Sequence, residues 1–297
     1  MILGRVTQST LFRELTTSVA RLQRQIADAQ AQVSSQKKLQ NPSDDPAGTA
    51  AANRLHGEVR ALAAAKDGIG LGNAVLSAED SALQQVESLL TRASEIAAQT
   101  TSGLVTPEQR QQASAEVVQI ESSVLSLANT AVGGRYVFGG LASGQQPFAN
   151  LDDPNFDAAT AYSGPTDPFV LPIGSGQTVT LTTPGDHVFG AAITALDDMR
   201  QTLAAGGTPT TSIDALAGAA AGIGEERAAI GGRMTRLQDR SDQIDSLTAG
   251  AQTLVSGIED VDLSAAISRF VQLQTALQAA LAVGNKLQTS VLDFLQL

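Results

Sequence analysis

Residues able to do chemistry are few in this sequence, and their spacing favours structural roles. Asp44 and Asp45 are adjacent carboxylates, a pair that could bind a metal ion or act in acid–base catalysis. Neither has a histidine or a third acidic residue nearby in sequence, and Pro46 follows directly. An aspartate before a proline at the first helical position is typical of a helix N-cap. We therefore interpret the pair as a turn and a cap.

The remaining candidate groups are isolated from one another. Asp152, Asp153 and Asp157 could ligate Ca²⁺, but they lack the spacing of a calcium-binding loop, which favours a solvated turn. His56 and His187 are far apart in sequence and have no clustered partners, so we treat both as structural or surface residues. The absence of cysteine excludes disulfides and thiolate metal sites. The sequence predicts no enzyme, no metal site and no cofactor.

Composition and charge narrow the class of protein further. The 297 residues carry 19 basic and 30 acidic side chains, and this net charge of −11 argues against nonspecific nucleic-acid binding. No apolar run is long enough to span a bilayer, and the first residues lack the apolar core of a signal peptide. We expect a protein without membrane insertion that is cytosolic or exported without a cleaved signal peptide.

The last segment, 263–297, has the clearest structural pattern. Its apolar and small residues alternate by three and four positions without a break, which is the period of a helix that packs on another helix. Its flanks carry only three charged residues and are otherwise mostly Gln, Thr, Ser, Asn and Ala. Such flanks suggest a helix covered on more than one side, although an ordinary alanine-rich helix with a thin core contact is the alternative. The seam comprises Leu263, Ala266, Phe270, Leu273, Leu277, Ala280, Gly284, Leu287, Val291 and Phe294.

The N-terminal segment repeats this pattern. Because two seams of matched length lie at opposite ends of the chain, we predict that they pair and that the middle of the sequence is a long excursion. The basic, acid-poor start is also compatible with a transit peptide or a membrane-surface helix, but the narrow continuous seam disfavours both. The N-terminal seam comprises Phe12, Leu15, Val19, Leu22, Ile26, Ala29 and Val33.

Four further helical segments are predicted between the terminal segments. One runs from Pro46 to about Thr101, and the next begins at the capping box of Thr106 and ends at the glycine pair 133–134. Helix returns from Ala191 onward and is broken at 206–209. A further helix then carries a long seam over 213–258 that is interrupted by three polar residues. Asp262 is a plausible cap for the final helix.

Residues 133–190 differ in composition from the rest of the chain. They contain seven of the ten aromatic residues and six of the ten prolines. Strand-forming residues at 136–138, 169–171 and 178–182 are separated by Gly, Pro and Asp turns. We predict a mainly α fold, a long helical coiled-coil bundle with paired terminal segments and a small β-rich insert. The predicted domains are terminal segments 1–43 plus 263–297, a helical bundle of 44–132 plus 191–262, and an insert of 133–190.

Several short motifs resemble the flagellin-like proteins of the bacterial flagellum. The loop after the first helix is similar to the family's signature loop, and residues 52–55 resemble the segment that follows it. Residues 134–140, 147–148, 162–164 and 185–190 resemble the β insert of the branch that joins the hook to the filament. The resemblance covers essentially the whole chain. The family loop comprises Asn41, Pro42, Ser43, Asp44, Asp45 and Pro46.

The resemblance implies a structural role in the flagellum without catalysis. In the family, terminal helices pair and become ordered on assembly as the inner tube of a helical stack, and subunits leave the cell unfolded through the type III export channel. The implied partners are identical subunits, hook-associated protein 1, flagellin and an export chaperone, at an extracellular location. Filament flagellin and a cytoplasmic signalling or adaptor coiled coil are the alternatives. The implied assembly interface comprises Phe12, Leu15, Val19, Leu22, Ile26 and Val33, with Phe270, Leu273, Leu277, Leu287, Val291 and Phe294.

Overall fold

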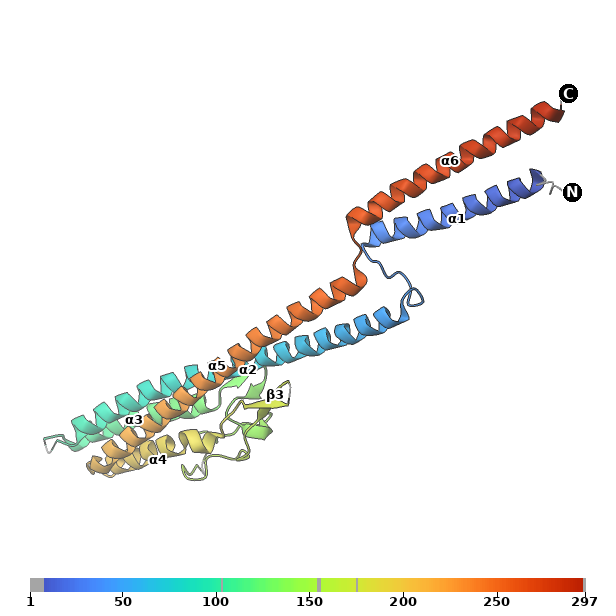
Figure 1. The fold of residues 1–297 in the computed structure, drawn as a ribbon. Coiled ribbons are helices and arrows are strands. Elements are labelled where there is room, and N and C mark those ends of the chain that lie inside the picture. Colours follow the sequence, from blue (N-terminus) through green and yellow to red (C-terminus); the bar gives the residue numbers. More distant parts are fainter. Residues whose placement is uncertain (1–7, 103, 154–155, 175, 296–297) are drawn as a thin grey trace. The chain divides into compact units, whose positions relative to one another are not determined.

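The structure, a computed structural model, describes residues 8–102, 104–153, 156–174 and 176–295. It is mainly helical with two small antiparallel hairpins, which confirms the predicted fold class (Figure 1). The helices are α1 (Gln8–Ser35), α2 (Pro46–Thr100), α3 (Pro107–Ala128), α4 (Gly185–Ala204), α5 (Thr210–Glu259) and α6 (Leu263–Leu295), with a short 3₁₀ turn η1 (Gly140–Ala142). The strands are β1 (Ala131–Val132), β2 (Arg135–Tyr136), β3 (Val170–Gly174) and β4 (Gln177–Thr180).

The chain divides into two compact units. Unit 1 consists of Met1–Arg60 and Leu247–Leu297, and unit 2 consists of Ala61–Ser246. The long helices α2 and α5 therefore contribute residues to both units. The three-part division predicted from the sequence stays a prediction.

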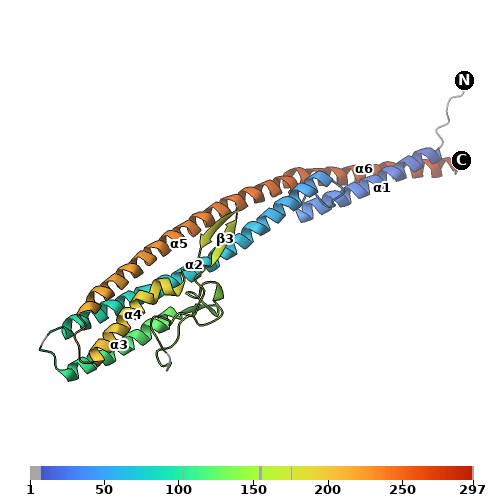
Figure 2. The ribbon, with the colours of Figure 1, turned by 90° about the horizontal axis from the view of Figure 1, so that it is seen from below.

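Unit 1 contains the paired terminal helices. α1 and α6 lie side by side and run antiparallel, as two views of the ribbon show (Figures 1 and 2). The predicted pairing of the terminal segments is thus present in the single chain. Burial along this pair is partial, because two helices without a third neighbour can cover only one stripe of each other.

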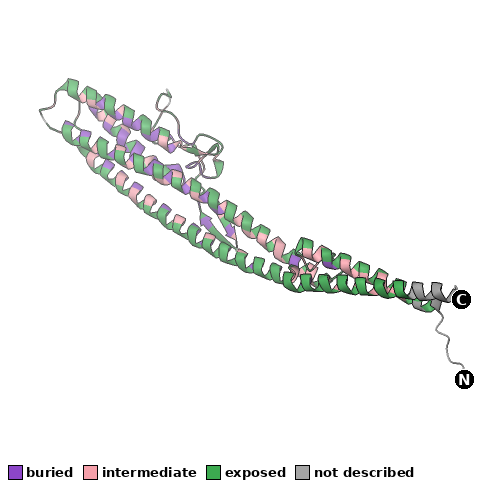
Figure 3. Cartoon of the chain, turned by 90° about the horizontal axis from the view of Figure 1, so that it is seen from above, coloured by how far each residue is buried: buried purple, intermediate pink, exposed green. Residues whose placement is uncertain are grey.

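Unit 2 contains the main hydrophobic core. Buried residues gather along the helices of this unit, where α2, α3, α4 and α5 contribute to one cluster (Figure 3). The seam predicted over 213–258 is confirmed within α5, since each seventh position from Leu216 to Ile244 is buried. These positions share one face of a helix and point to the same neighbours. They are Leu216, Ile223, Ile230, Leu237 and Ile244.

The end of α3 corrects one prediction. The Thr106 capping box is present as expected, but the helix ends at Ala128 rather than at the glycine pair. Ala131 instead pairs with Tyr136 in a short hairpin, and Gly133 and Gly134 form its turn with φ of +58° and +79°. Glycine adopts this left-handed backbone at little cost, so a Gly-Gly pair suits a two-residue hairpin turn as well as a helix end.

The predicted strands and the start of the next helix also need correction. Strand 136–138 is shorter than expected, because Val137 and Phe138 lie outside β2 and are buried. The β3–β4 hairpin is present, although its bounds differ from 169–171 and 178–182 by one to three residues. α4 begins at Gly185, six residues before the predicted start at Ala191. Pro184 precedes this helix without a side-chain cap, so the sequence gives no capping signal there.

Aromatic rings join the irregular segment to α4. The rings of Phe138 and Phe189 meet edge to face with centroids 4.7 Å apart, and Phe148 meets Phe189 at 5.7 Å in the same geometry. Phe148 also packs on Tyr162, with centroids 5.2 Å apart. Gly185 permits this packing, because a Cβ there would lie 2.5 Å from Phe148 Cε2. Four of the seven aromatic residues of this segment therefore belong to one local cluster.

Candidate assembly interface

The contact between α1 and α6 uses the seam residues predicted from the sequence. Ala29 and Ala266 are buried at 3% and 6% exposure, and most other described seam residues are half-buried. Phe12 and Leu263 are exceptions, with 61% and 40% of their surfaces exposed. The half-buried candidates are Leu15, Val19, Leu22, Ile26 and Val33 on α1 and Phe270, Leu273 and Leu277 on α6. Their role in assembly stays a prediction.

The far end of the seam is only partly described. Gly284 sits close to α1, since a Cβ at this position would lie 2.9 Å from Leu15 Cδ2. A small residue here lets the two helices approach closely. Leu287, Val291 and Phe294 lie in α6, but their side chains fall outside the described part of the structure.

A second apolar face of α6 is exposed in the isolated chain. On a helix of ~3.6 residues per turn, its members lie along one side, roughly 100° around the axis from the seam. We call these residues the outer stripe: Ile267, Val271 and Leu281, which are 45%, 51% and 50% exposed. Apolar residues aligned on one helix face, beside uncharged neighbours, are typical of a protein contact surface.

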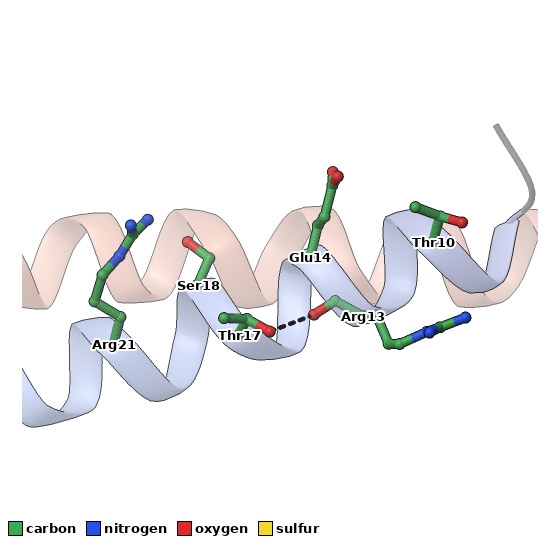
Figure 4. A pocket seen from close by; sticks show the side chains of 6 residues that line it. All are labelled: Thr10, Arg13, Glu14, Thr17, Ser18 and Arg21. Atoms are coloured by element: carbon green, nitrogen blue, oxygen red, sulfur yellow. Dashed lines mark hydrogen bonds between the residues drawn. The ribbon is translucent and has the colours of Figure 1, made fainter.

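The outer face of α1 is polar and open. A shallow hollow of about 560 Å³ follows this face, and its lining side chains point in different directions rather than toward a common point (Figure 4). Thr17 Oγ1 donates a hydrogen bond to the carbonyl of Arg13 at 2.9 Å, which is a local helix contact. The hollow has no convergent polar groups of the kind that fix a small ligand. It is lined by Thr10, Arg13, Glu14, Thr17, Ser18 and Arg21.

Two short segments of unit 1 are held together where α1 and α5 end. Lys38 donates its backbone N–H to the carbonyl of Glu259 at 2.6 Å, and Val261 donates to the carbonyl of Gln36 at 3.0 Å. We call residues 36–38 with 259–261 the clasp. Gln36 has a φ of +59°, a left-handed conformation that turns the chain out of α1 and into this pairing.

Charged side chains reinforce the clasp. Lys37 Nζ lies 3.1 Å from Glu259 Oε2 and 2.7 Å from Asp260 Oδ1, and His56 Nε2 lies 2.8 Å from Glu259 Oε1. Hydrogen bonds from His56 and Lys37 lower the pKa of Glu259 below its ordinary value. This ion-pair cluster was not predicted from the sequence, although the opposite charges of Lys37 and the acidic run 259–262 indicate it.

Replacing Glu259 with alanine is expected to loosen the clasp. The change removes the acceptor of His56 and one of the two acceptors of Lys37, and we expect a loss of about 1 kcal/mol because the partners are partly solvated. Hydrogen exchange should become faster at the amides of Lys38 and Val261. The exposed Glu58, also in unit 1, provides the control Glu58→Ala. Unchanged exchange at both amides in Glu259→Ala would contradict the prediction.

The family loop forms the predicted turn and cap. Asp44 Oδ2 accepts from the backbone N–H of Asn41 at 2.9 Å, and Asp45 Oδ1 accepts from that of Gly48 at 2.9 Å. Asp262 caps α6 in the same way by accepting from Ser264 and Ala265. Within the described ranges, no group of three or more His, Cys, Asp or Glu side chains could hold a metal ion. None of the helices described is long and apolar enough to cross a membrane.

Two models of known protein families match this chain, one in its N-terminal part and one in its C-terminal part. Residues 8–143 match the bacterial flagellin N-terminal helical region, and residues 213–295 match the bacterial flagellin C-terminal helical region. The chain belongs to the bacterial flagellin family. The antiparallel pair α1–α6 is therefore the pairing of the two helical regions that characterise this family.

Curated relatives of this flagellin-family chain include two kinds of protein. It is 25% identical over 271 residues to the flagellin of Listeria monocytogenes, covering 87% of this chain and 86% of that protein. It is also 25% identical over 288 residues to the flagellar hook-associated protein 3 of Escherichia coli, covering 84% and 86%. Sequence identity alone does not separate the two kinds.

Solved structures share the fold. A putative flagellar hook-associated protein from Vibrio parahaemolyticus superposes with a TM-score of 0.61 at 18% identity, covering 73% of this chain and 100% of that one. FlgL from Bacillus cereus superposes with a TM-score of 0.59 at 20% identity, covering 68% and 99%. At these identities the likeness concerns the fold alone.

Proposed function

We propose that this chain forms the junction between the flagellar hook and the filament. Its membership of the flagellin family makes it a structural protein of the flagellum, and its relatives include proteins named hook-associated protein 3. The proposed partners are identical subunits, hook-associated protein 1 on the hook side and flagellin on the filament side. The role needs no catalysis and no cofactor.

The observation that carries the proposal is the exposed outer stripe of α6. The seam is already occupied by α1, so the stripe is a separate apolar surface of the same helix. Burying a partly exposed side chain such as Ile267 or Val271 gains on the order of 1 kcal/mol. Repeated contact between identical subunits around one axis would cover the stripe of every copy.

The export route and location follow from the same proposal. The subunit would be exported unfolded through the type III channel and would act outside the cell, at the hook–filament junction. Before assembly, the seam and the outer stripe would expose apolar side chains of α6 whenever the terminal helices were unpaired. An export chaperone that covers this helix is therefore part of the proposal.

Deletion of the gene tests the junction role. We expect electron micrographs to show complete hooks without filaments, and a blot to show flagellin released into the medium, because filament subunits would have no surface to grow on. Complementation with the wild-type gene is the control. Normal filaments in the deletion strain would contradict the proposal.

Filament flagellin is the second candidate, because the Listeria flagellin matches as much of the chain as hook-associated protein 3 does. The same deletion separates the two. If the chain were the filament subunit, hooks would lack filaments and no flagellin would be found in cells or medium. Abundance also differs, since a filament needs many copies and a junction only a thin collar.

A further inference from the structure

Unit 2 buries a carboxylate that has no charged partner of its own. Glu79 on α2 is 1% exposed, and its Oε1 makes no hydrogen bond. The charged groups that face it are Glu226 and Arg233, both on α5. Arg233 Nη1 lies 3.0 Å from Glu226 Oε1, without the alignment of a hydrogen bond, and Arg233 Nη2 donates to Thr183 Oγ1 at 3.1 Å.

The charges in this cluster are unequal. Thr183 Oγ1 also donates to Glu226 Oε1 at 2.6 Å. Glu226 therefore accepts the hydrogen bond of this hydroxyl and forms the ion pair with Arg233. One guanidinium cannot neutralise both the buried Glu79 and the half-buried Glu226, and an ionised group without a partner is costly to bury. Burial therefore raises the pKa of Glu79 to about 9, with Arg233 opposing and Glu226 adding to the effect. At neutral pH the folded chain keeps Glu79 protonated.

A second cluster between α3 and α4 repeats the arrangement. Glu121 has no exposed surface; its Oε2 accepts from Arg200 Nε at 3.0 Å, while its Oε1 has no partner. Arg200 is shared with Asp197, so two carboxylates again face one guanidinium. Burial raises the pKa of Glu121 to about 7; the charge of Arg200 opposes this effect and that of Asp197 adds to it.

A third cluster shows what exposure changes. Arg227 on α5 donates to Asp80 at 2.9 Å and to Glu87 at 2.8 Å, so two carboxylates again face one guanidinium. The side chains of Asp80 and Glu87 are 39% and 43% exposed, so water compensates the extra negative charge.

We propose that unit 2 takes up protons when it folds, at Glu79 and Glu121, and is therefore destabilised as the pH rises from 6 to 8. An acid whose folded pKa is raised contributes stability that is complete below its unfolded pKa and is lost as the pH rises toward the folded pKa. Glu108, Glu259 and Asp260 have pKa values below their ordinary values. The stability that these groups contribute therefore changes in the acid range, below pH 6. The inference does not depend on the proposed junction role.

Urea unfolding of the full-length protein at pH 6, 7 and 8 tests the proposal. Tyrosine fluorescence reports unit 2 alone, because Tyr136 and Tyr162 are the only tyrosines and the sequence has no tryptophan. Each proton released on unfolding changes the equilibrium constant about tenfold per pH unit. With both groups acting, we expect the unfolding constant to rise about a thousandfold from pH 6 to pH 8.

Single substitutions assign the effect to its residues. The rise should fall to about tenfold in Glu79→Gln, which leaves only Glu121, and to about a hundredfold in Glu121→Gln. Glu87→Gln, on the same helix as Glu79 but at the exposed cluster, should keep the wild-type rise. A wild-type rise in Glu79→Gln would overturn the assignment to that residue.

A measurement on the wild-type protein alone covers the case in which a variant fails to fold. Unfolding at pH 7 in weak buffer, followed with an indicator dye, should release between about one and two protons per chain. Release of no protons, or equal unfolding constants at pH 6 and pH 8, would overturn the proposal.

Discussion

Replacement of Val271 by aspartate is expected to block incorporation into flagella while leaving the isolated subunit folded. Val271 is 51% exposed and lies in the outer stripe of α6, away from the seam with α1, so its replacement leaves the seam residues unchanged. In an assembly that covers the stripe, the new carboxylate would be buried without a partner, at a cost of several kcal/mol in every subunit. Circular dichroism should match wild type, and motility and junction formation should be lost.

Two further variants of α6 complete this experiment. Gln272→Asp adds the same charge outside the stripe, where the carboxylate can pair with Arg269 three residues away, and should assemble. Leu277→Asp places the charge in the seam, and should unpair α1 and α6 in the isolated chain as well. Normal assembly of Val271→Asp would show that the outer stripe is not a contact surface.

The substitution Phe189→Ala is expected to destabilise unit 2 by about 3–5 kcal/mol. Phe189 is fully buried in α4 and contacts the rings of both Phe138 and Phe148, so its removal leaves a cavity and breaks two edge-to-face pairs. The near-ultraviolet circular dichroism of Tyr162 should weaken, since its ring packs on Phe148. The midpoint of urea unfolding gives the magnitude.

The exposed Leu141 is a control for this change in the same segment. It is 60% exposed, so Leu141→Ala should change the free energy of unfolding by less than about 0.5 kcal/mol. A similar small effect of Phe189→Ala would mean that the aromatic cluster contributes little to the attachment of this segment to α4.

The helical part of the fold could be predicted because its contacts repeat with the period of the helix. The pairing of α1 with α6 and the buried positions of α5 both follow from apolar residues spaced by three and four. The β segment was harder, because the glycine pair 133–134 suits a helix end and a hairpin turn equally well. The early start of α4 at Gly185 had no capping residue to mark it.

The polar sites were predicted less completely, for different reasons. The cap at Asp45 has a local signature, whereas the clasp joins residues far apart in sequence. The sequence does mark Glu79 as unusual: it stands between Leu76 and Leu83 at a spacing of three and four, where an apolar residue is expected. The sequence does not indicate that Arg233 lies near Glu79, or that Arg233 already pairs with Glu226. Both facts depend on the packing between α2 and α5.

The clasp has a consequence for the order of folding. The contact between Lys37 and Glu259 closes a loop of 222 residues, and closure of so long a loop from an unfolded chain costs about 5 kcal/mol in entropy. The ion pair between Lys66 and Asp245 ties the two ends of unit 2 together, so only a few tens of residues remain to be closed once that unit has folded. This lowers the entropic cost by roughly 1.5 kcal/mol. The terminal helices are therefore expected to pair last, after the middle of the chain has brought its ends together.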